Sequence, residues 1–264
     1  MTLHYAKLDS TRTFTKKYSF CTLVTNFDEY LEMIQSAKLA GFDREDVEYF
    51  YIDNIGQNSE DGFSGINKAF KNVNGKYLIF CHQDIVFKFD NIDNIDKLDE
   101  CIADLEEKDP NWAVVGNAGK KENGEIILRI TDPHGDNSKL GSFPEEVVSL
   151  DENFLVLNRS VSLSTSFDLK GFHLYGLDIC RNANYLGYKN YVIDFHLLHK
   201  SGGKIDHSFI KAQNIYSILE HERKNRNFYT TTCTNFYAGS SSILNCILKV
   251  KFLFKIYKRF NRLR

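Results

Sequence analysis

The first third of the chain alternates short apolar runs with stretches in which apolar residues recur at helical spacing. The apolar runs, which predict buried strands, cover residues 18–25, 47–52 and 77–81. The helical stretches cover residues 28–40, with Gly41 as a stop, and 63–73. Strand, helix, strand, helix and strand in this order predict βαβ units and a parallel sheet, with right-handed crossovers that pack both helices against it.

Beyond residue 84 the period of the pattern changes. Helices are predicted over 96–108, over 177–186 with an end at Gly187, and over 208–226. Strands are predicted at 112–116, 125–130, 147–157 and 188–198, the third of them interrupted by Asp151-Glu152-Asn153. Residues 131–143 are expected to form a loop, 166–175 are polar and aromatic, and 230–242 show little pattern.

A polar triplet, His82-Gln83-Asp84, follows the apolar run Tyr77-Leu78-Ile79-Phe80-Cys81. In open α/β sheets, ligands bind in the crevice beyond the carboxyl ends of the strands. Asp84 is therefore expected where a metal ion or a phosphate could bind. The alternative is a strand-end turn in which Asp84 only caps local backbone groups, and the triplet alone does not decide between the two.

Composition is that of a soluble globular protein and narrows the classes of partner. The 264 residues carry a formal net charge of −2, so no global field points to nucleic acid. The six cysteines form no C-x-x-C pair, which disfavours a disulfide framework or a structural zinc site and favours a reducing compartment. The N-terminus lacks the apolar core of a signal peptide, and no apolar run reaches the ~18 residues of a spanning helix.

The C-terminal segment, residues 243–264, contains seven Lys and Arg and no Asp or Glu. At about 100° per residue its basic side chains cluster in one sector, opposite a broad aromatic and aliphatic face. This pattern suits the surface of an anionic membrane. The alternative is a C-terminal helix docked on the domain with its lysines in solvent.

Six sequence blocks follow one another at a specific spacing, and they are FCTLVTNF, YIDN, INKAFKNVNGKYLIFCHQDIVF, VVGNAG, DENFLVLNRS and GFHLYGLDICRNANYLGYKNYVIDFHLLHKSGG. Over roughly residues 18–204 the chain thereby resembles the family 2-type glycosyltransferases, more narrowly the bacterial glycosyltransferase-like branch of surface-polysaccharide gene clusters. The resemblance implies a GT-A fold, an α/β architecture with a Rossmann-like, mostly parallel sheet flanked by helices.

The resemblance also divides the chain into parts. Residues 18–116 would be the nucleotide-sugar-binding half and 117–206 the acceptor-binding half. The remaining parts are a polar N-terminal arm (1–17), a C-terminal helix and loop (207–240) and a basic amphipathic tail (241–264).

Members of the family carry an Asp-x-Asp-like motif where this chain has His82-Gln83-Asp84. The resemblance implies that Asp84 and His199, which follows a later strand, are ligands of Mn²⁺ or Mg²⁺. The first acidic position of the motif is His82 here, and His82 and Gln83 are expected beside the nucleotide. The other nucleotide contacts implied by position are Thr25, Asn26, Asp53, Asn67 and Lys71.

The catalytic base of the family is an acid at the start of a helix on the acceptor side, and Asp178 matches that position. His173 and Tyr175 are expected either to line the acceptor site or only to pack. His196 is expected to be less well placed than His199, because an odd offset along a strand turns a side chain to the opposite face.

Each of these roles has a structural alternative in the residues themselves. Asp178 at a helix start could simply stabilise the helix dipole. His199 could be a strand-end histidine with a satisfied hydrogen bond, and Asp53 could be a turn former.

The activity implied is an inverting, metal-dependent glycosyl transfer of the hexosyltransferase type. A divalent cation would neutralise the charge that grows on the leaving diphosphate, and a carboxylate would take the proton of the acceptor hydroxyl. The donor would be a nucleoside-diphosphate sugar, a uridine one, and the acceptor a glycan or lipid-linked molecule in surface polysaccharide synthesis. The partners would be donor, acceptor and, through the tail, an anionic membrane surface, with no nucleic acid.

Two alternatives belong to other classes of function. One is a catalytically silent nucleotide- or sugar-binding module of the same fold. The other is a nucleotidyltransferase, which the segment VTNFDEY disfavours because it lacks a Gly-rich, basic phosphate loop. The location expected is the cytoplasm, peripheral on the inner face of the cell membrane.

Overall fold

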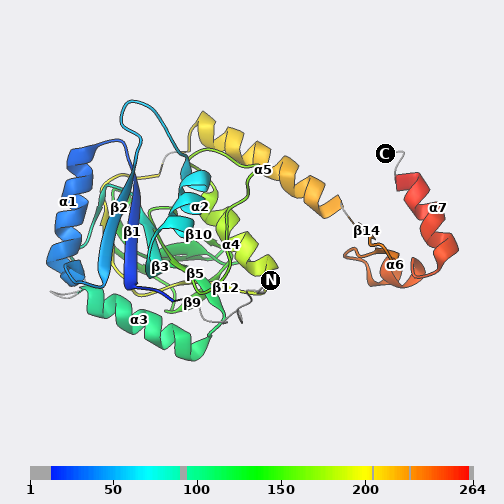
Figure 1. Ribbon diagram of the computed structural model, residues 1–264, viewed down its shortest axis with the longest axis horizontal. Helices are drawn as coiled ribbons and strands as arrows, with labels where there is room; N and C mark the ends of the chain where they lie inside the picture. The colour runs from blue at the N-terminus through cyan, green and yellow to red at the C-terminus, as the bar shows by residue number, and fades with distance from the viewer. Residues whose placement is uncertain (1–12, 90–93, 204, 226, 262–264) are drawn as a thin grey trace, which may run out of the picture. The chain divides into compact units, whose positions relative to one another are not determined.

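The computed structural model describes residues 13–89, 94–203, 205–225 and 227–261. The chain forms two compact units, residues 1–209 and 210–264 (Figure 1). Residues 1–12 of the predicted polar arm lie outside the described residues. The last residues of that arm, Lys16 and Lys17, already belong to the first strand.

A seven-stranded sheet forms the centre of the N-terminal unit. In spatial order its strands are β2 (Val47–Asp53), β1 (Lys16–Val24), β3 (Gly75–Cys81), β11 (Phe154–Asn158), β5 (Trp112–Gly116), β12 (Lys189–Val192) and β9 (Glu145–Val147). Strands β2, β1, β3, β5 and β12 run in one direction, whereas β11 and β9 run opposite. The predicted mostly parallel α/β sheet is therefore confirmed, with the antiparallel β11 inserted beside β3.

Helices cover both faces of this sheet, and β3 shows how the sequence divides between them. Tyr77, Ile79 and Cys81 belong to a core cluster with α1 (Phe27–Ala37) and α3 (Asn94–Lys108). Phe80, which alternates with them, points the other way and contacts the ring of Tyr175, the first residue of α4 (Tyr175–Tyr185). Figure 1 shows α1 on one side of β1 and β2, and α2 (Gly62–Asn72) and α4 on the other.

Local signals in the sequence account for the helix boundaries. The side chain of Asn26 caps α1 by accepting hydrogen bonds from the backbone amides of Asp28 and Glu29. Asp61 and Ser64 form a reciprocal capping box at the start of α2. After α1 comes a short turn, η1 (Lys38–Phe42), in which the backbone leaves helical geometry at Ala40 and Gly41. The φ of +90° at Gly41 is a conformation that glycine adopts without steric cost.

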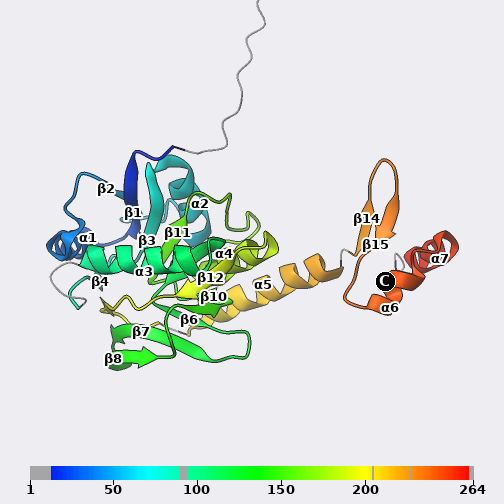
Figure 2. The same cartoon turned by 90° about the horizontal axis from the view of Figure 1, so that it is seen from below.

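A second, smaller sheet has the order β10 (Ser149–Leu150), β6 (Ala118–Lys120), β7 (Ile126–Asp132), β13 (Leu197–His199) and β4 (Ile85–Val86), and β8 (Gly135–Leu140) pairs with β7. Figure 2 shows β7 and β8 at the lower edge of this unit. The loop prediction for 131–143 is wrong at β8, because GDNSKL is polar on both faces and lacks apolar alternation. The single strand predicted over 188–198 is in fact β12 and β13, which belong to different sheets.

The C-terminal unit begins at Ile210, within helix α5 (His207–Asn225). Strands β14 (Phe228–Thr230) and β15 (Asn235–Tyr237) form an antiparallel hairpin in a region for which the sequence pattern predicted nothing. The amphipathic tail contains two helices, α6 (Ser242–Ile247) and α7 (Lys251–Asn261), rather than one. Among the described helices, none combines the length and the apolar character needed to cross a membrane.

Candidate active site

Strands β1, β2 and β3 place their carboxyl ends at one edge of the main sheet. The parallel register pairs Val24 with Asp53 and Cys21 with Phe80, so the residues that follow each strand lie side by side. These residues are polar in all three strands. Because β11 is antiparallel to β3, with Phe154 opposite Cys81, the residues before β11 reach the same edge.

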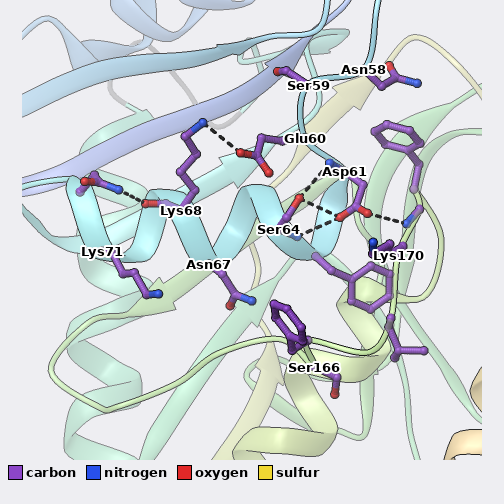
Figure 3. Close-up of a pocket in the computed structure, with 16 residues that line it drawn as sticks. Asn58, Ser59, Glu60, Asp61, Ser64, Asn67, Lys68, Lys71, Ser166 and Lys170 are labelled. Atoms are coloured by element: carbon purple, nitrogen blue, oxygen red, sulfur yellow. Dashed lines mark hydrogen bonds and ion pairs between the residues drawn. The ribbon is translucent and has the colours of Figure 1, made fainter.

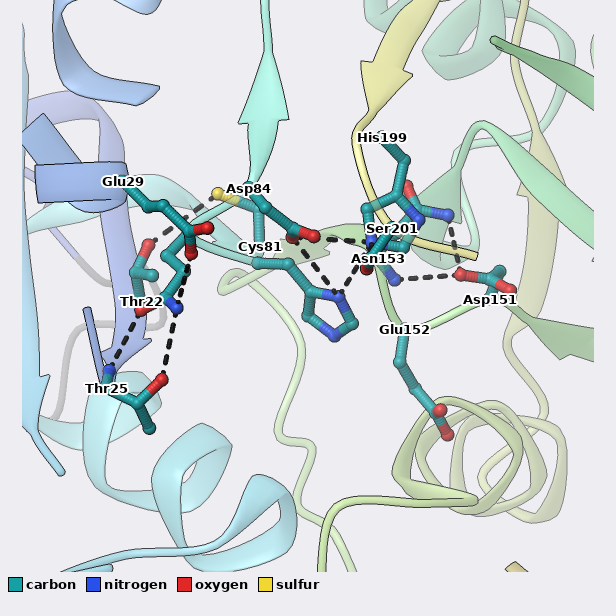
Figure 4. Close-up of polar contacts among 12 residues, drawn as sticks. Thr22, Thr25, Glu29, Cys81, Asp84, Asp151, Glu152, Asn153, His199 and Ser201 are labelled. Carbon is teal, nitrogen blue, oxygen red and sulfur yellow. Dashed lines mark hydrogen bonds and ion pairs between the residues drawn. The ribbon is translucent and has the colours of Figure 1, made fainter. Parts of the chain in front are cut away.

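Three side chains at this edge form a compact cluster, His82, Asp84 and His199. Figure 4 labels two of them, Asp84 and His199. His82 Nδ1 lies 3.3 Å from His199 Nε2, and His199 Nε2 lies 3.4 Å from the nearer carboxylate oxygen of Asp84. The distance between His82 Nδ1 and that oxygen is 4.0 Å. The antiparallel pairing of β13 with β4 sets His199 opposite Ile85 and thereby brings it to Asp84.

The cluster holds a carboxylate in its charged form. Burial alone raises the pKa of Asp84, but hydrogen bonds from His199 and Ser201 outweigh it and lower that pKa well below the ordinary value. Partial desolvation and the neighbouring His199 lower the pKa of His82, which favours the neutral imidazole. A charged carboxylate beside a neutral imidazole is the protonation state that a bound divalent cation requires.

The donor set fits a divalent cation. The ligand atoms of the three residues all lie within 4.8 Å of one another, so one ion could contact all three. Two imidazoles and one carboxylate leave positions open for other ligands, an arrangement typical of transition-metal ions rather than of Mg²⁺, which prefers oxygen. The side chain of His82 is 40% exposed, so the cluster is open to solvent on its side.

The middle residue of the triplet, Gln83, holds the start of α1. Its amide oxygen accepts hydrogen bonds from the backbone amides of Thr25 and Asn26, at 2.9 and 3.0 Å. Its amide nitrogen donates to the hydroxyl of Thr25 and to the carboxylate of Glu29, at 3.1 and 2.9 Å. The structure thus brings Thr25, Asn26 and Gln83 together at the carboxyl ends of β1 and β3, beside the cluster.

Tyr175 connects the cluster to the start of α4. Its buried hydroxyl lies 3.1 Å from His82 Nε2 and donates to the backbone carbonyl of Glu152 at 3.2 Å. Tyr175 therefore orients the second nitrogen of His82.

Glu152, which the sequence reasoning did not assign to the site, lies at the amino end of α4. Its carboxylate accepts a hydrogen bond from the backbone amide of Gly176 at 3.2 Å, whereas Leu174 in the capping position provides no side-chain cap. A Cβ on Gly176 would lie only 3.1 Å from Glu152 Cγ and 2.4 Å from the carbonyl oxygen of Leu150, so this approach depends on glycine. Burial and the charge of Asp151 raise the pKa of Glu152 to about 8.

A signal for Glu152 was present in the sequence. The polar interruption Asp151-Glu152-Asn153 directly precedes the strand β11. Reading β11 as antiparallel would have placed its amino end at the carboxyl end of β3, where His82 donates its backbone amide to the carbonyl of Asn153.

Asp178, the expected catalytic base, lies inside the protein with no exposed surface. One carboxylate oxygen accepts a hydrogen bond from the backbone amide of Ser166 and the other from its hydroxyl, both at 2.6 Å. Asn182 donates to the first of these oxygens at 3.2 Å. This placement argues against the role of base, because an acceptor hydroxyl cannot contact a carboxylate that is fully enclosed. The hydrogen bonds of Asp178 instead hold the segment around Ser166 in position.

Other expected site residues lie apart from the cluster. The side chain of Asp53 accepts from the backbone amide of Ile55, which is the turn-forming alternative, although Asp53 remains at the edge beside Val24. His173 lies 2.9 Å from the hydroxyl of Ser208. His196 lies 2.9 Å from the hydroxyl of Thr131 and stacks on Phe89, so it points away from the cluster as expected.

Asn67 and Lys71 lie on α2, beside a groove of about 900 Å³ between that helix and residues 166–172 (Figure 3). The side-chain amide of Asn67 donates a hydrogen bond to the backbone carbonyl of Thr165 and accepts one from the backbone amide of Thr165. None of the residues that line the groove belongs to the His82–Asp84–His199 cluster. Contact of Asn67 or Lys71 with a nucleotide therefore stays a prediction.

Comparison with known proteins gives one relative in sequence and several in fold. No protein-family model matches the chain. The chain is 36% identical over 202 residues, which is 74% of its own length and 80% of the relative, to a Fuscovulum blasticum protein called ATP synthase subunits region ORF 6. That name states no activity.

Two solved structures share the fold at low sequence identity. The crystal structure of S. aureus TarS 1-349 in complex with UDP superposes with a TM-score of 0.51 and 12% identity, over 79% of this chain and 69% of that one. GalNAc-T7 with UDP, GalNAc and Mn²⁺ has a TM-score of 0.50 and 12% identity, over 78% of this chain. The match spans about half of the GalNAc-T7 chain, 48%.

At 12% identity these likenesses establish the architecture alone, whereas the match in sequence establishes kinship. The chain belongs to the same family as the Fuscovulum blasticum protein, and its fold is the GT-A fold of the glycosyltransferases.

Proposed function

We propose that the protein is a metal-dependent glycosyltransferase that uses a nucleoside-diphosphate sugar. The observation that carries the proposal is the cluster of His82, Asp84 and His199 at the carboxyl edge of β3, in a fold of this class. A cation held there would lie where an open α/β sheet binds its ligand. The related structures were obtained with UDP, in one case with Mn²⁺, which supports a uridine nucleotide as the first donor to test.

The cation we propose is Mn²⁺ rather than Mg²⁺. Its ligands would be Asp84 and His199, as the resemblance implies, and also His82, which lies as close to His199 as Asp84 does. When bound, it would supply the positive charge that stabilises the leaving diphosphate. Two imidazoles among three ligands favour Mn²⁺ over Mg²⁺.

The base we propose is Glu152 in place of the enclosed Asp178. In the transfer, the acceptor oxygen forms a bond to the anomeric carbon of the donor while its proton passes to the Glu152 carboxylate. The bond from that carbon to the diphosphate oxygen breaks, and the nucleoside diphosphate leaves with the electron pair. A pKa raised to about 8 makes the charged Glu152 carboxylate a stronger proton acceptor than an ordinary glutamate. Attack from the side opposite the diphosphate would invert the anomeric configuration.

The acceptor we propose is a hydroxyl of a glycan or lipid-linked molecule in surface polysaccharide synthesis. This part rests on the resemblance of the sequence blocks and on the basic tail. A cytoplasmic position at the inner membrane face follows from the same two features.

Binding of UDP in the presence of Mn²⁺ tests the site directly. Isothermal titration calorimetry of the full chain should give UDP binding that requires Mn²⁺ and that weakens by at least about 100-fold in His199→Gln. His196→Gln is the matched control, since His196 lies three residues earlier and outside the cluster, and it should bind as the parent does. UDP binding that is indifferent to both Mn²⁺ and His199→Gln would contradict the proposal.

The second candidate is a silent nucleotide- or sugar-binding module of the same fold. Two observations favour it, the histidine at the first position of the motif and the full burial of Asp178. A screen of nucleotide sugars with Mn²⁺ separates the two functions, because an enzyme will release nucleoside diphosphate from one of them and a module will bind without turnover.

A further inference from the structure

The C-terminal unit buries only part of the apolar face of α7. The ring of Phe254 lies 5.7 Å from that of Phe228 on β14, and the ring of Tyr257 lies 5.6 Å from that of Tyr237 on β15. Phe254 is buried. Positions three apart on a helix share one face, so this is the face of α7 that docks on the hairpin.

A second apolar face of α7 remains exposed. Phe252, Ile256 and Phe260 are four residues apart and therefore align along the helix, and they are 70%, 40% and 69% exposed. The preceding helix α6 likewise exposes Ile243 and Ile247. Large exposed side chains that align in this way mark an interaction surface rather than scattered surface residues.

Positive charge borders this face. Lys255 and Arg259 lie one position before Ile256 and Phe260, at the same spacing of four. The sequence has no Asp or Glu after Glu222, so the face carries no carboxylate to neutralise them. An exposed apolar row flanked by unneutralised basic residues is complementary to a bilayer interface with anionic headgroups.

We propose that the face formed by Phe252, Ile256 and Phe260, with Lys255 and Arg259 beside it, binds the surface of an anionic lipid bilayer. The aromatic and aliphatic side chains enter the acyl boundary while the basic side chains stay among the headgroups. A second copy of the chain is a poorer occupant, because it would bring the same cations together without a carboxylate between them. This inference deepens the proposed function, which expects a lipid-linked acceptor, and it does not depend on transfer activity.

Vesicle co-sedimentation of the full chain tests the proposal. The parent protein should bind vesicles that contain about one third phosphatidylglycerol, and bind phosphatidylcholine vesicles at least about tenfold more weakly. The variant F252S/I256S/F260S should lose at least about tenfold in binding to the anionic vesicles. Equal binding to both vesicle types, or no loss in the variant, would overturn the proposal.

Matched controls separate the face from general hydrophobicity and from misfolding. The variant L39S/I126S/L140S removes three exposed apolar side chains from the N-terminal unit and should bind vesicles as the parent does. Mn²⁺-dependent UDP binding should be the same in both triple variants, so a failure of this proposal is distinguishable from a failure of the proposed function.

The basic residues have their own test. K255Q/R259Q should weaken binding to the anionic vesicles several-fold and reduce its dependence on salt. If the parent is a dimer by size-exclusion chromatography with light scattering, becomes a monomer in F252S/I256S/F260S and ignores vesicles, a second copy covers the face and the proposal is overturned.

Discussion

The carboxyl edge of β3 and the start of α4 each offer a carboxylate that the sequence marks for chemistry, yet the two regions treat it differently. At the edge, Asp84 faces His82 and His199, which are potential ligands, and His82 is accessible to solvent. At α4, Asp178 has both oxygens occupied by Ser166 and no exposed surface. A carboxylate whose acceptor positions the protein itself fills is structural, whereas one that faces other ligands at an open edge is available to a cation.

The largest effect is expected at Glu152, whose carboxylate accepts a hydrogen bond from Gly176 in the first turn of α4 and which we propose as the base instead of Asp178. Glu152→Gln should lower the turnover number by about 10²–10⁴, the usual contribution of a general base, with UDP binding unchanged. Glutamine keeps the acceptor for the amide of Gly176, so the helix cap remains. Asp178→Asn is the matched control for turnover, and normal turnover in Glu152→Gln would exclude Glu152 as the base.

The next largest effect is expected for the enclosed carboxylate. Asp178→Ala should lower the free energy of unfolding by about 2–4 kcal/mol, because the buried amide and hydroxyl of Ser166 lose their acceptors. Urea denaturation followed by circular dichroism measures this. Asp168→Ala, which removes an exposed carboxylate from the same segment, serves as a comparison. A loss below about 0.5 kcal/mol in Asp178→Ala would mean that Asp178 does not anchor this segment.

A smaller effect is expected on the metal preference of the His82–Asp84–His199 cluster. His82→Asp replaces one imidazole of the cluster with an oxygen ligand, so the ratio of Mg²⁺ to Mn²⁺ affinity should rise by about tenfold. Metal titration by calorimetry in the absence of nucleotide reads this ratio without any need for turnover. An unchanged ratio would show that His82 is not a ligand.

The last expected effect is a dependence of stability on pH. Since the pKa of Glu152 is about 8 in the folded protein against an ordinary 4.5, the folded state binds a proton there that the unfolded chain releases between these values. The free energy of unfolding should therefore fall as pH rises from about 4.5 to about 8, and this component should be absent in Glu152→Gln. Urea denaturation of both proteins at several pH values measures the difference, and identical slopes would contradict the raised pKa.

Much of the site followed from local pattern. The apolar run of β3 and the polar triplet after it indicated a ligand-binding edge, and the structure has Asp84 there with His199 close by. His196 lies outside the cluster and contacts Thr131, but it precedes β13 and does not share a strand with His199, as the offset argument assumed. The inference about the edge uses only the pattern along β3.

The remaining features depend on which strands pair and in which direction. Glu152 reaches the edge because β11 runs antiparallel to β3, and His82 meets His199 because β13 pairs with β4 rather than continuing β12. The hairpin of β14 and β15 decides which side of α7 is buried.

The sequence by itself determined the α/β class, the helices and buried strands of the first βαβ units, and the polar ends of those strands, because periodicity and capping are properties of neighbouring residues. Only the tertiary structure decided that Asp178 is enclosed, that Glu152 lies at the start of α4 and that His82 joins the cluster. The physical reason is that burial and strand pairing join residues distant in the chain, and such contacts leave no periodic trace in either segment.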